Sequence, residues 1–229
     1  MDYLFKLASL IFRRLWFGEL SPEYFFSIQK FRSRHPSTRI AFKSCFKSDV
    51  SLRFEYLCRK KPGLPDYNTG EKILFDNHAG GLSYDQICRI KGKPFSAKYE
   101  RMGTKLVKVI CFRDTILEKS VKAGFFFLEE RFFLGEYMFQ SYNRETLESI
   151  RNGLQAKYHI TTDKDGKNFY ITDENGSVIF YNDSGHSLNV HYYFPQLQEI
   201  HKFLLDSLPG LTAKKERTPA GGKSLSDIL

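Results

Sequence analysis

Start and stop signals for one short helix lie in Gly81-Leu82-Ser83-Tyr84-Asp85-Gln86-Ile87-Cys88-Arg89-Ile90-Lys91-Gly92-Lys93-Pro94. The Ser83 hydroxyl can accept from a first-turn amide, and the Gln86 side chain can reach back to the Ser83 amide. Gly92 can take the left-handed conformation that ends helices, and Pro94 cannot continue one. The segment therefore predicts a two-turn helix that begins after Ser83 and ends at Gly92.

Three strand-like runs follow this helix. They are rich in β-branched and aromatic residues and span residues 106–112, 121–128 and 132–139. Turns around Asp114 and around residues 129–131 separate them. Residues 81–142 are therefore predicted to form one unit, in which a helix is followed by a three-stranded antiparallel sheet.

The same order recurs in residues 143–210. Asn143 can cap a helix, one face of which holds Leu147, Ile150, Leu154 and Tyr158. Strands are predicted at residues 169–172, 178–181 and 188–193, with Asn175-Gly176 as a hairpin turn. A closing helix over residues 195–208 is expected to end at Pro209-Gly210. The predicted fold class is therefore α+β, built from tandem units of a helix plus three antiparallel strands.

The spacing in the first helix resembles that of the SmpA/OmlA family of small outer-membrane assembly lipoproteins. The residues that match are Gly81, Leu82, Ser83, Gly92 and Pro94. The resemblance covers residues 81–140 and implies a β-lactamase-inhibitor-protein-like (BLIP-like) fold, with a binding surface and without catalysis. The chain shows neither a signal peptide nor a lipid-acceptor cysteine after one, so the family's outer-membrane location does not carry over.

Residues 1–20 predict an amphipathic helix. Its broad apolar side holds Leu4, Phe5, Leu7, Ala8, Ile11, Phe12, Leu15 and Trp16. The longest stretch without a charge, residues 7–12, is far shorter than the roughly 18 apolar residues of a membrane span, so no transmembrane helix is predicted. Two alternatives remain, a helix packed on its own domain and a helix lying on a membrane surface.

The remaining segments complete the predicted domain organisation. Residues 38–60 predict a β-hairpin, because apolar and polar residues alternate from Val50 to Tyr56. The Pro- and Gly-containing stretch that follows predicts a loop. The chain is thus divided into a basic helix and hairpin (1–61), a loop (62–80), the two units (81–142 and 143–210) and a flexible tail (211–229).

Charge is concentrated at the start of the chain. The 229 residues include 35 Lys plus Arg and 26 Asp plus Glu, which gives a net charge of +9. Residues 1–61 hold 13 basic and 5 acidic side chains, so 13 − 5 = 8 of this surplus lies there. This segment is expected to face nucleic acid, an acidic protein or phospholipid headgroups, or to be a solvated surface without a partner.

Composition also indicates the compartment. The four cysteines include no C-x-x-C pair, which argues against a disulfide scaffold and a four-cysteine zinc site. We therefore expect a reducing compartment and a cytoplasmic location, with attachment to a membrane surface through residues 1–20 as a further expectation.

No motif for catalysis, metal binding or cofactor binding is found, so the sequence predicts neither an enzyme nor a metal or cofactor site. The six histidines show no metal-ligand spacing, and no nucleophile elbow occurs. The most site-like polar cluster is Asp76-Asn77-His78, since an aspartate can orient a histidine. A turn is the commoner role for such residues.

The leading functional prediction is a non-enzymatic protein-binding or adaptor protein. Its candidate contacts lie on the predicted sheet and in the tail: Phe125, Phe127, Tyr181, Tyr192, Tyr193, Leu225, Ile228 and Leu229. Because residues 125–127 make both sheet faces apolar, a helix of this chain or a partner must cover each face. The alternative is a nucleic-acid-associated protein with these basic contacts: Lys43, Lys47, Arg53, Arg59, Lys60 and Lys61.

Overall fold

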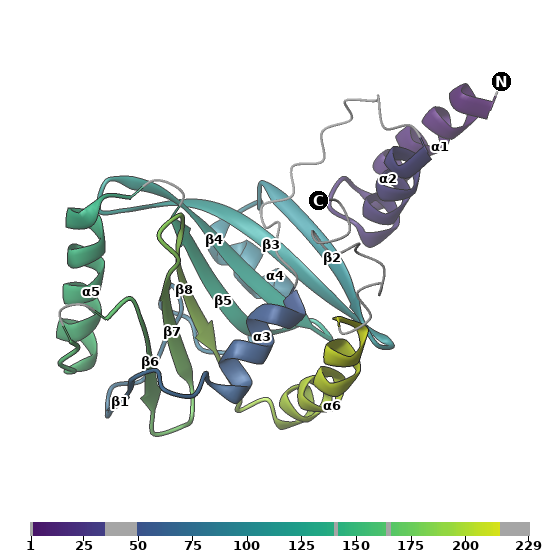
Figure 1. The fold of residues 1–229 in the computed structure, drawn as a ribbon. Helices are drawn as coiled ribbons and strands as arrows, with labels where there is room; N and C mark the ends of the chain where they lie inside the picture. Colours follow the sequence, from purple (N-terminus) through teal and green to yellow (C-terminus); the bar gives the residue numbers. More distant parts are fainter. Residues whose placement is uncertain (1, 35–49, 140–141, 164–165, 216–229) are drawn as a thin grey trace, which may run out of the picture.

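A single mixed sheet organises the chain. The computed structural model describes residues 2–34, 50–139, 142–163 and 166–215. These residues form an α+β fold with an eight-stranded sheet in the order β1-β6-β7-β8-β5-β4-β3-β2 (Figure 1). The α+β class predicted from the sequence is confirmed.

The strands form two runs that meet in the middle of the sheet. Their bounds are β1 Asp66–Thr69, β2 Ser96–Met102, β3 Lys105–Ile116, β4 Lys119–Leu128, β5 Arg131–Phe139, β6 Asn168–Asp173, β7 Val178–Asp183 and β8 Leu188–Tyr193. The pairs β2–β3, β3–β4, β4–β5, β6–β7 and β7–β8 are antiparallel hairpins, β5 pairs antiparallel with β8, and β1 pairs parallel with β6. The two predicted units therefore share one continuous sheet.

The short helix predicted within residues 81–94 is confirmed. It is α4, Tyr84–Lys91, and it is preceded by a capping box in which the Ser83 hydroxyl accepts from the Gln86 amide at 3.2 Å. The Gln86 side chain accepts from the Ser83 amide at 2.7 Å. Gly92 follows the helix at a φ of 80°, a conformation that glycine adopts without a Cβ clash. Local sequence alone thus encodes both ends of α4.

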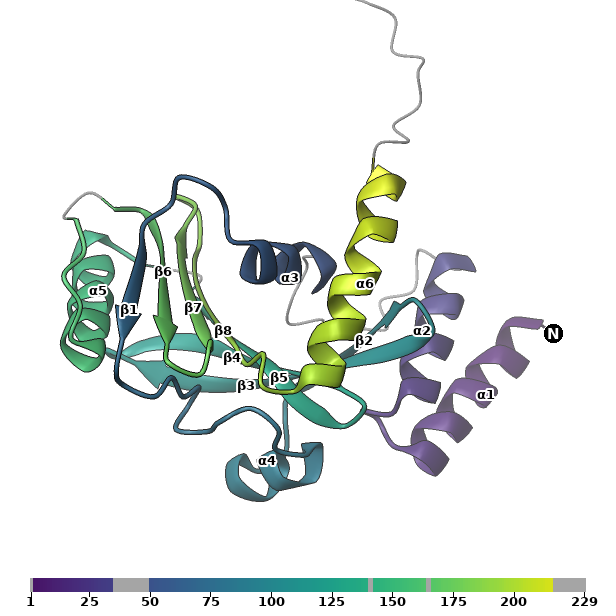
Figure 2. The same ribbon diagram turned by 90° about the horizontal axis from the view of Figure 1, so that it is seen from below.

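Helices of the chain cover both faces of the sheet (Figure 2). On one face, α4 and α5 (Arg144–Tyr158) contribute Ile87, Leu154 and Tyr158 to an aromatic core. On the other face, α3 (Val50–Arg59) and α6 (Gln198–Lys215) pack against the sheet through the side chains Phe54, Leu57, Ile200 and Leu204. Side chains of β4 pack in both cores, because successive side chains of a strand point to opposite faces of the sheet.

The predicted strands and the α5 helix are present, but the first unit has four strands instead of three. The missed strand is β2, which lies at the edge of the sheet. It contributes only Ala97 and Tyr99 to the α4 face and Met102 to the other, so its apolar pattern is weak. The predicted three-stranded first unit is therefore wrong.

The predicted hairpin is wrong from Val50 onward, where the chain forms α3. The buried residues Arg53, Phe54 and Leu57 share one side of this helix, since positions i, i+1 and i+4 are neighbours on its surface. The alternation predicts a strand only if Arg53 faces solvent, whereas Arg53 is buried. Residues 38–49 of the predicted hairpin lie outside the described residues.

Two further boundaries differ from the prediction. The loop at residues 62–80 contains β1, which pairs with β6. Helix α6 continues through Pro209-Gly210 to Lys215, so residues 211–215 belong to it and not to a tail. Pro209 lacks an amide proton and removes one helical hydrogen bond, which is not enough to end this helix. The rest of the predicted tail lies outside the described residues.

Candidate interaction surface

Two helices at one end of the molecule form a hairpin. They are α1 (Asp2–Phe17) and α2 (Pro22–Arg34), and a small apolar cluster of Leu10, Tyr24, Ile28 and Phe31 joins them. Helix α2 is absent from the sequence prediction, although two signals mark its start. The Ser21 hydroxyl accepts from the Tyr24 amide at 3.2 Å, and Pro22 occupies the first helical position.

Helix α2 attaches this hairpin to the edge of the sheet. Its Phe25 ring lies 5.5 Å from the ring of Tyr99 on β2, and the Tyr99 hydroxyl donates to the carbonyl oxygen of Leu20. The Arg101 guanidinium of β2 lies over the Phe26 ring. Helix α1 packs on the outer side of α2, away from the sheet (Figure 2). One side of α1 therefore packs on the chain, and the other faces outward.

The outward side of α1 is apolar along its whole length. It consists of Leu4, Phe5, Ala8, Ile11, Phe12, Leu15 and Trp16, and we call it the apolar face of α1. All seven are exposed, and the six large side chains are between 54% and 81% exposed. At 100° per residue they occupy one continuous arc that contains no charged residue.

The structure shows which side of the helix predicted in residues 1–20 packs on the chain. The helix is confirmed, and Leu10 packs against α2. Phe5, Phe12 and Trp16 are not shielded by the described residues. The rings of Phe12 and Trp16 stack on each other at 5.6 Å and remain exposed. Any cover for this face must come from elsewhere.

A groove runs beside the apolar face, between α1 and α2. Its volume is about 250 Å³, and Phe5 of the apolar face is one of its walls. Lys6 and Arg13 of α1 and Lys30 of α2 also line it, together with the hydroxyls Ser9 and Ser27. On α1, Arg14 flanks the apolar face on the side away from Lys6 and Arg13. Basic side chains therefore border the apolar face on both sides, and the one on the Arg14 side is paired with Glu19 at 3.1 Å.

The contact residues predicted on the sheet are buried and are not part of this surface. All five are at most 7% exposed: Phe125, Phe127, Tyr181, Tyr192 and Tyr193. The first four belong to the core under α4 and α5, and the last to the core under α3 and α6. They pack the sheet against the chain's own helices, so the surface role expected for them is corrected to a packing role. Leu225, Ile228 and Leu229 lie outside the described residues.

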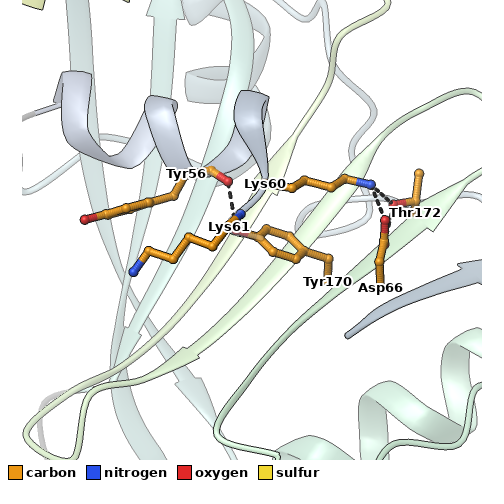
Figure 3. A network of polar contacts seen from close by, with 6 residues as sticks. All are labelled: Tyr56, Lys60, Lys61, Asp66, Tyr170 and Thr172. Atoms are coloured by element: carbon orange, nitrogen blue, oxygen red, sulfur yellow. Dashed lines mark hydrogen bonds and ion pairs between the residues drawn. The ribbon is translucent and has the colours of Figure 1, made fainter. Parts of the chain in front are cut away.

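The basic residues of the nucleic-acid alternative do not form one patch in the part of the chain that the structure describes. Arg53 is buried in an ion pair with Glu136. Lys60 lies between the Asp66 carboxylate at 2.5 Å and the Thr172 hydroxyl at 2.8 Å (Figure 3). Arg59 and Lys61 are exposed. Lys43 and Lys47 lie outside the described residues.

The network around Lys60 and Lys61 holds the end of α3 against the sheet. The Tyr170 hydroxyl accepts from the Lys61 amide at 3.0 Å and donates to the Tyr56 carbonyl oxygen at 2.9 Å (Figure 3). The Lys61 ammonium lies 4.1 Å from the centre of the Tyr56 ring. Thr172 donates to Asp66 at 2.9 Å and links β6 to β1. These contacts give the two lysines a structural role.

The cluster at Asp76-Asn77-His78 is a turn. Asp76 and Asn77 both have positive φ angles, and the backbone groups of Phe75 and His78 exchange two hydrogen bonds. Asp76 forms an ion pair with Lys91 of α4, which lies 3.2 Å from Asp114. Burial lowers the pKa of Lys91, but these two carboxylates outweigh it and hold the pKa above its ordinary value. The cluster ties α4 to the sheet.

The described parts of the chain contain no helix that is both long and apolar enough to cross a bilayer. Within the same residues, no group of three His, Cys, Asp or Glu side chains could hold a metal ion. Cys58 and Cys88 carry free thiols, whereas Cys111 is disulfide-bonded. The reducing compartment that the cysteine count favours stays a prediction.

No protein-family model matches this sequence, and comparisons with curated proteins and with solved structures find no match either. The resemblance of residues 81–140 to the SmpA/OmlA family therefore stays a prediction.

Proposed function

We propose that this chain is a non-enzymatic binding protein that attaches to its partner through the apolar face of α1. One observation carries the proposal. Eight of the twelve exposed large hydrophobic side chains among the described residues belong to α1, and six of them lie on its apolar face. The leading class expected from the sequence is kept, but the contact surface moves from the sheet to this helix.

Exposed apolar area is the reason to assign a binding role to α1. Burial of each large apolar side chain on this face is worth about 1.5–3 kcal/mol, so a partner gains most of its affinity there. Contiguous exposed apolar patches mark interaction surfaces, whereas single exposed side chains such as Ile90 and Leu205 are normal. The BLIP-like fold, which stays a prediction, would equally imply binding without catalysis.

The test compares two double variants of the full-length protein in an extract of the cells that make it. Phe12→Gln with Leu15→Gln removes two large side chains from the apolar face of α1. Ile90→Gln with Leu205→Gln makes the same change at exposed helical positions on α4 and α6. Glutamine is a good helix former, so both variants should keep their helices.

Sedimentation velocity of the extract gives the readout. We expect the wild type and the Ile90/Leu205 variant to sediment with material much larger than the 26.8 kDa chain. The Phe12/Leu15 variant should sediment as the free chain. Wild type that sediments as the free chain, or a Phe12/Leu15 variant that behaves like wild type, would refute a docking role for α1.

A further inference from the structure

We propose that the apolar face of α1 binds the surface of an anionic phospholipid bilayer, with lipid phosphate held in the groove between α1 and α2. The inference rests on the proposed function, which it deepens by naming the partner. Three observations carry it: the shape of the apolar face, the charges that border it and the chemistry of the groove.

The shape of the face fits a flat apolar layer. Its residues run from Leu4 in the first turn to Trp16 in the last, so the whole length of α1 can lie parallel to a surface. A helix of 16 residues is about 24 Å long. The face is the outer side of a helix at the end of the molecule, and the sheet lies behind α2 (Figure 2). The body of the protein therefore does not obstruct contact with a membrane.

The side chains on this face are those of interfacial helices. Such helices place Trp, Phe and Leu among the acyl chains and keep Lys and Arg at the level of the headgroups. Here Leu15 and Trp16 are the most exposed large side chains near the end of the helix, and Arg13 and Arg14 precede them on either side of the arc. Apolar residues thus occupy one side of α1 and basic residues flank it, as in helices that lie at a bilayer interface.

The residues that line the groove favour a partner with negative charge. Three cations, Lys6, Arg13 and Lys30, converge on it, and the hydroxyls Ser9 and Ser27 add hydrogen-bonding groups. Ammonium, guanidinium and hydroxyl groups are the side chains that bind phosphate oxygens. Because Phe5 borders both the groove and the apolar face, a phosphate in the groove lies next to acyl chains on the face. This is the arrangement of headgroup and chain in a phospholipid.

The charge balance of the hairpin favours an anionic partner as well. Residues 2–34 contain six basic and three acidic side chains. Among the acidic ones, Glu19 forms an ion pair with Arg14 at 3.1 Å. None of the groove residues is acidic. A zwitterionic bilayer would satisfy the apolar face, but it has no net negative charge to attract the basic residues of the hairpin.

Trp16 makes the proposal directly measurable, because it is the single tryptophan of the chain. Full-length protein is mixed with vesicles of phosphatidylcholine alone or with 30% phosphatidylglycerol. With the anionic vesicles, we expect the Trp16 emission to shift to shorter wavelength, to become protected from acrylamide and to be quenched by brominated acyl chains. Binding should weaken as salt is raised, because salt screens the charges.

Variants separate the two parts of the site. Phe12→Gln should lower the vesicle partition coefficient about tenfold or more, whereas Ile90→Gln should leave it unchanged. Changing Lys6, Arg13 and Lys30 to Gln should lower binding to anionic vesicles about fivefold for each cation. The matched control removes three exposed cations elsewhere, by changing Arg89, Lys93 and Lys119 to Gln. It should bind anionic vesicles with at most a small loss.

Several outcomes would overturn the inference. Trp16 emission that stays constant with both vesicle types would do so, and so would equal binding to neutral and anionic vesicles. Trp16 already protected from acrylamide without lipid, in a protein that sediments as a dimer, would assign the face to a second copy of the chain. If vesicles fail while the extract experiment still shows association that depends on α1, the lipid inference falls and the proposed function stands.

Discussion

The guanidinium Nε of Arg53 lies 2.7 Å from a carboxylate oxygen of Glu136, and these side chains are only 7% and 1% exposed. The pair joins α3 to β5, near the middle of the sheet. His191 of β8 is the cross-strand partner of Glu136, and its Nδ1 lies 3.9 Å from the same carboxylate oxygen. A buried charge cluster therefore fixes the position of α3.

Removing the cation from this pair should destabilise the protein. Arg53→Met leaves the Glu136 carboxylate buried without its partner, which should lower the free energy of unfolding at pH 8 by about 3–5 kcal/mol. Replacing both members, Arg53→Met with Glu136→Leu, should recover most of this loss because no buried charge remains. Urea denaturation measures both. As a control, Arg59→Met on the exposed side of α3 should change stability by less than about 0.5 kcal/mol.

The same cluster predicts two opposing pH effects. Burial raises the pKa of Glu136 to about 7 from 4.5, although Arg53 opposes this. Between these values the folded protein holds a proton that the unfolded chain has lost, so lowering the pH stabilises the fold. Burial, and then Arg53, lowers the pKa of His191 to about 3 from 6.5. Here the unfolded chain takes the proton first, so lowering the pH from 6.5 destabilises the fold.

Single variants should expose each effect. As the pH is lowered from 6.5 to 4.5, the free energy of unfolding of Glu136→Gln should fall more steeply than that of the wild type, because only the His191 effect remains in this variant. Over the same pH change, the free energy of unfolding of His191→Gln should rise relative to that of the wild type. Urea titrations at several pH values decide this. Parallel pH profiles for all three proteins would show that neither group has a shifted pKa.

Gly135 should tolerate no side chain, because a Cβ there would lie 2.3 Å from Cγ of Phe75. The Phe75 ring is fully buried and cannot move freely. Gly135→Ala should therefore cost about 1–3 kcal/mol, which lowers the melting temperature by a few degrees or more. Gly153 in α5 is the matched control, since no atom lies within 4 Å of a Cβ built there. Gly153→Ala should raise stability by up to about 1 kcal/mol.

The elements that could be predicted are those that short sequence patterns specify. Both ends of α4 are encoded within residues 83–92, and the turn at Asn175-Gly176 separates two strands with regular patterns. Helix α3 could not be predicted in this way. Burial of Arg53 depends on Glu136, which lies 136 − 53 = 83 residues further along the chain. A local pattern carries no information on such a partner, so the sequence around Arg53 does not predict its burial.

The interaction surface was predictable only in part. The helical period of residues 1–20 indicates an apolar side, and α1 confirms it. Which side remains exposed depends on α2, because Leu10 is covered by α2 while Phe12 is not. The groove likewise requires Ser27 and Lys30 from α2. Recognition of Ser21-Pro22-Glu23 as a helix start would have been the first step towards this surface.

The strand order has a consequence for synthesis of the protein. Among the described strands, β8 is the last to be made, yet it lies between β5 and β7. Before residues 188–193 leave the ribosome, the hairpins on either side have no partner, and both present unpaired backbone groups at an open edge. Such edges pair readily with other chains. We therefore expect nascent chains that stop before β8 to aggregate and to depend on chaperones until the central strand closes the sheet.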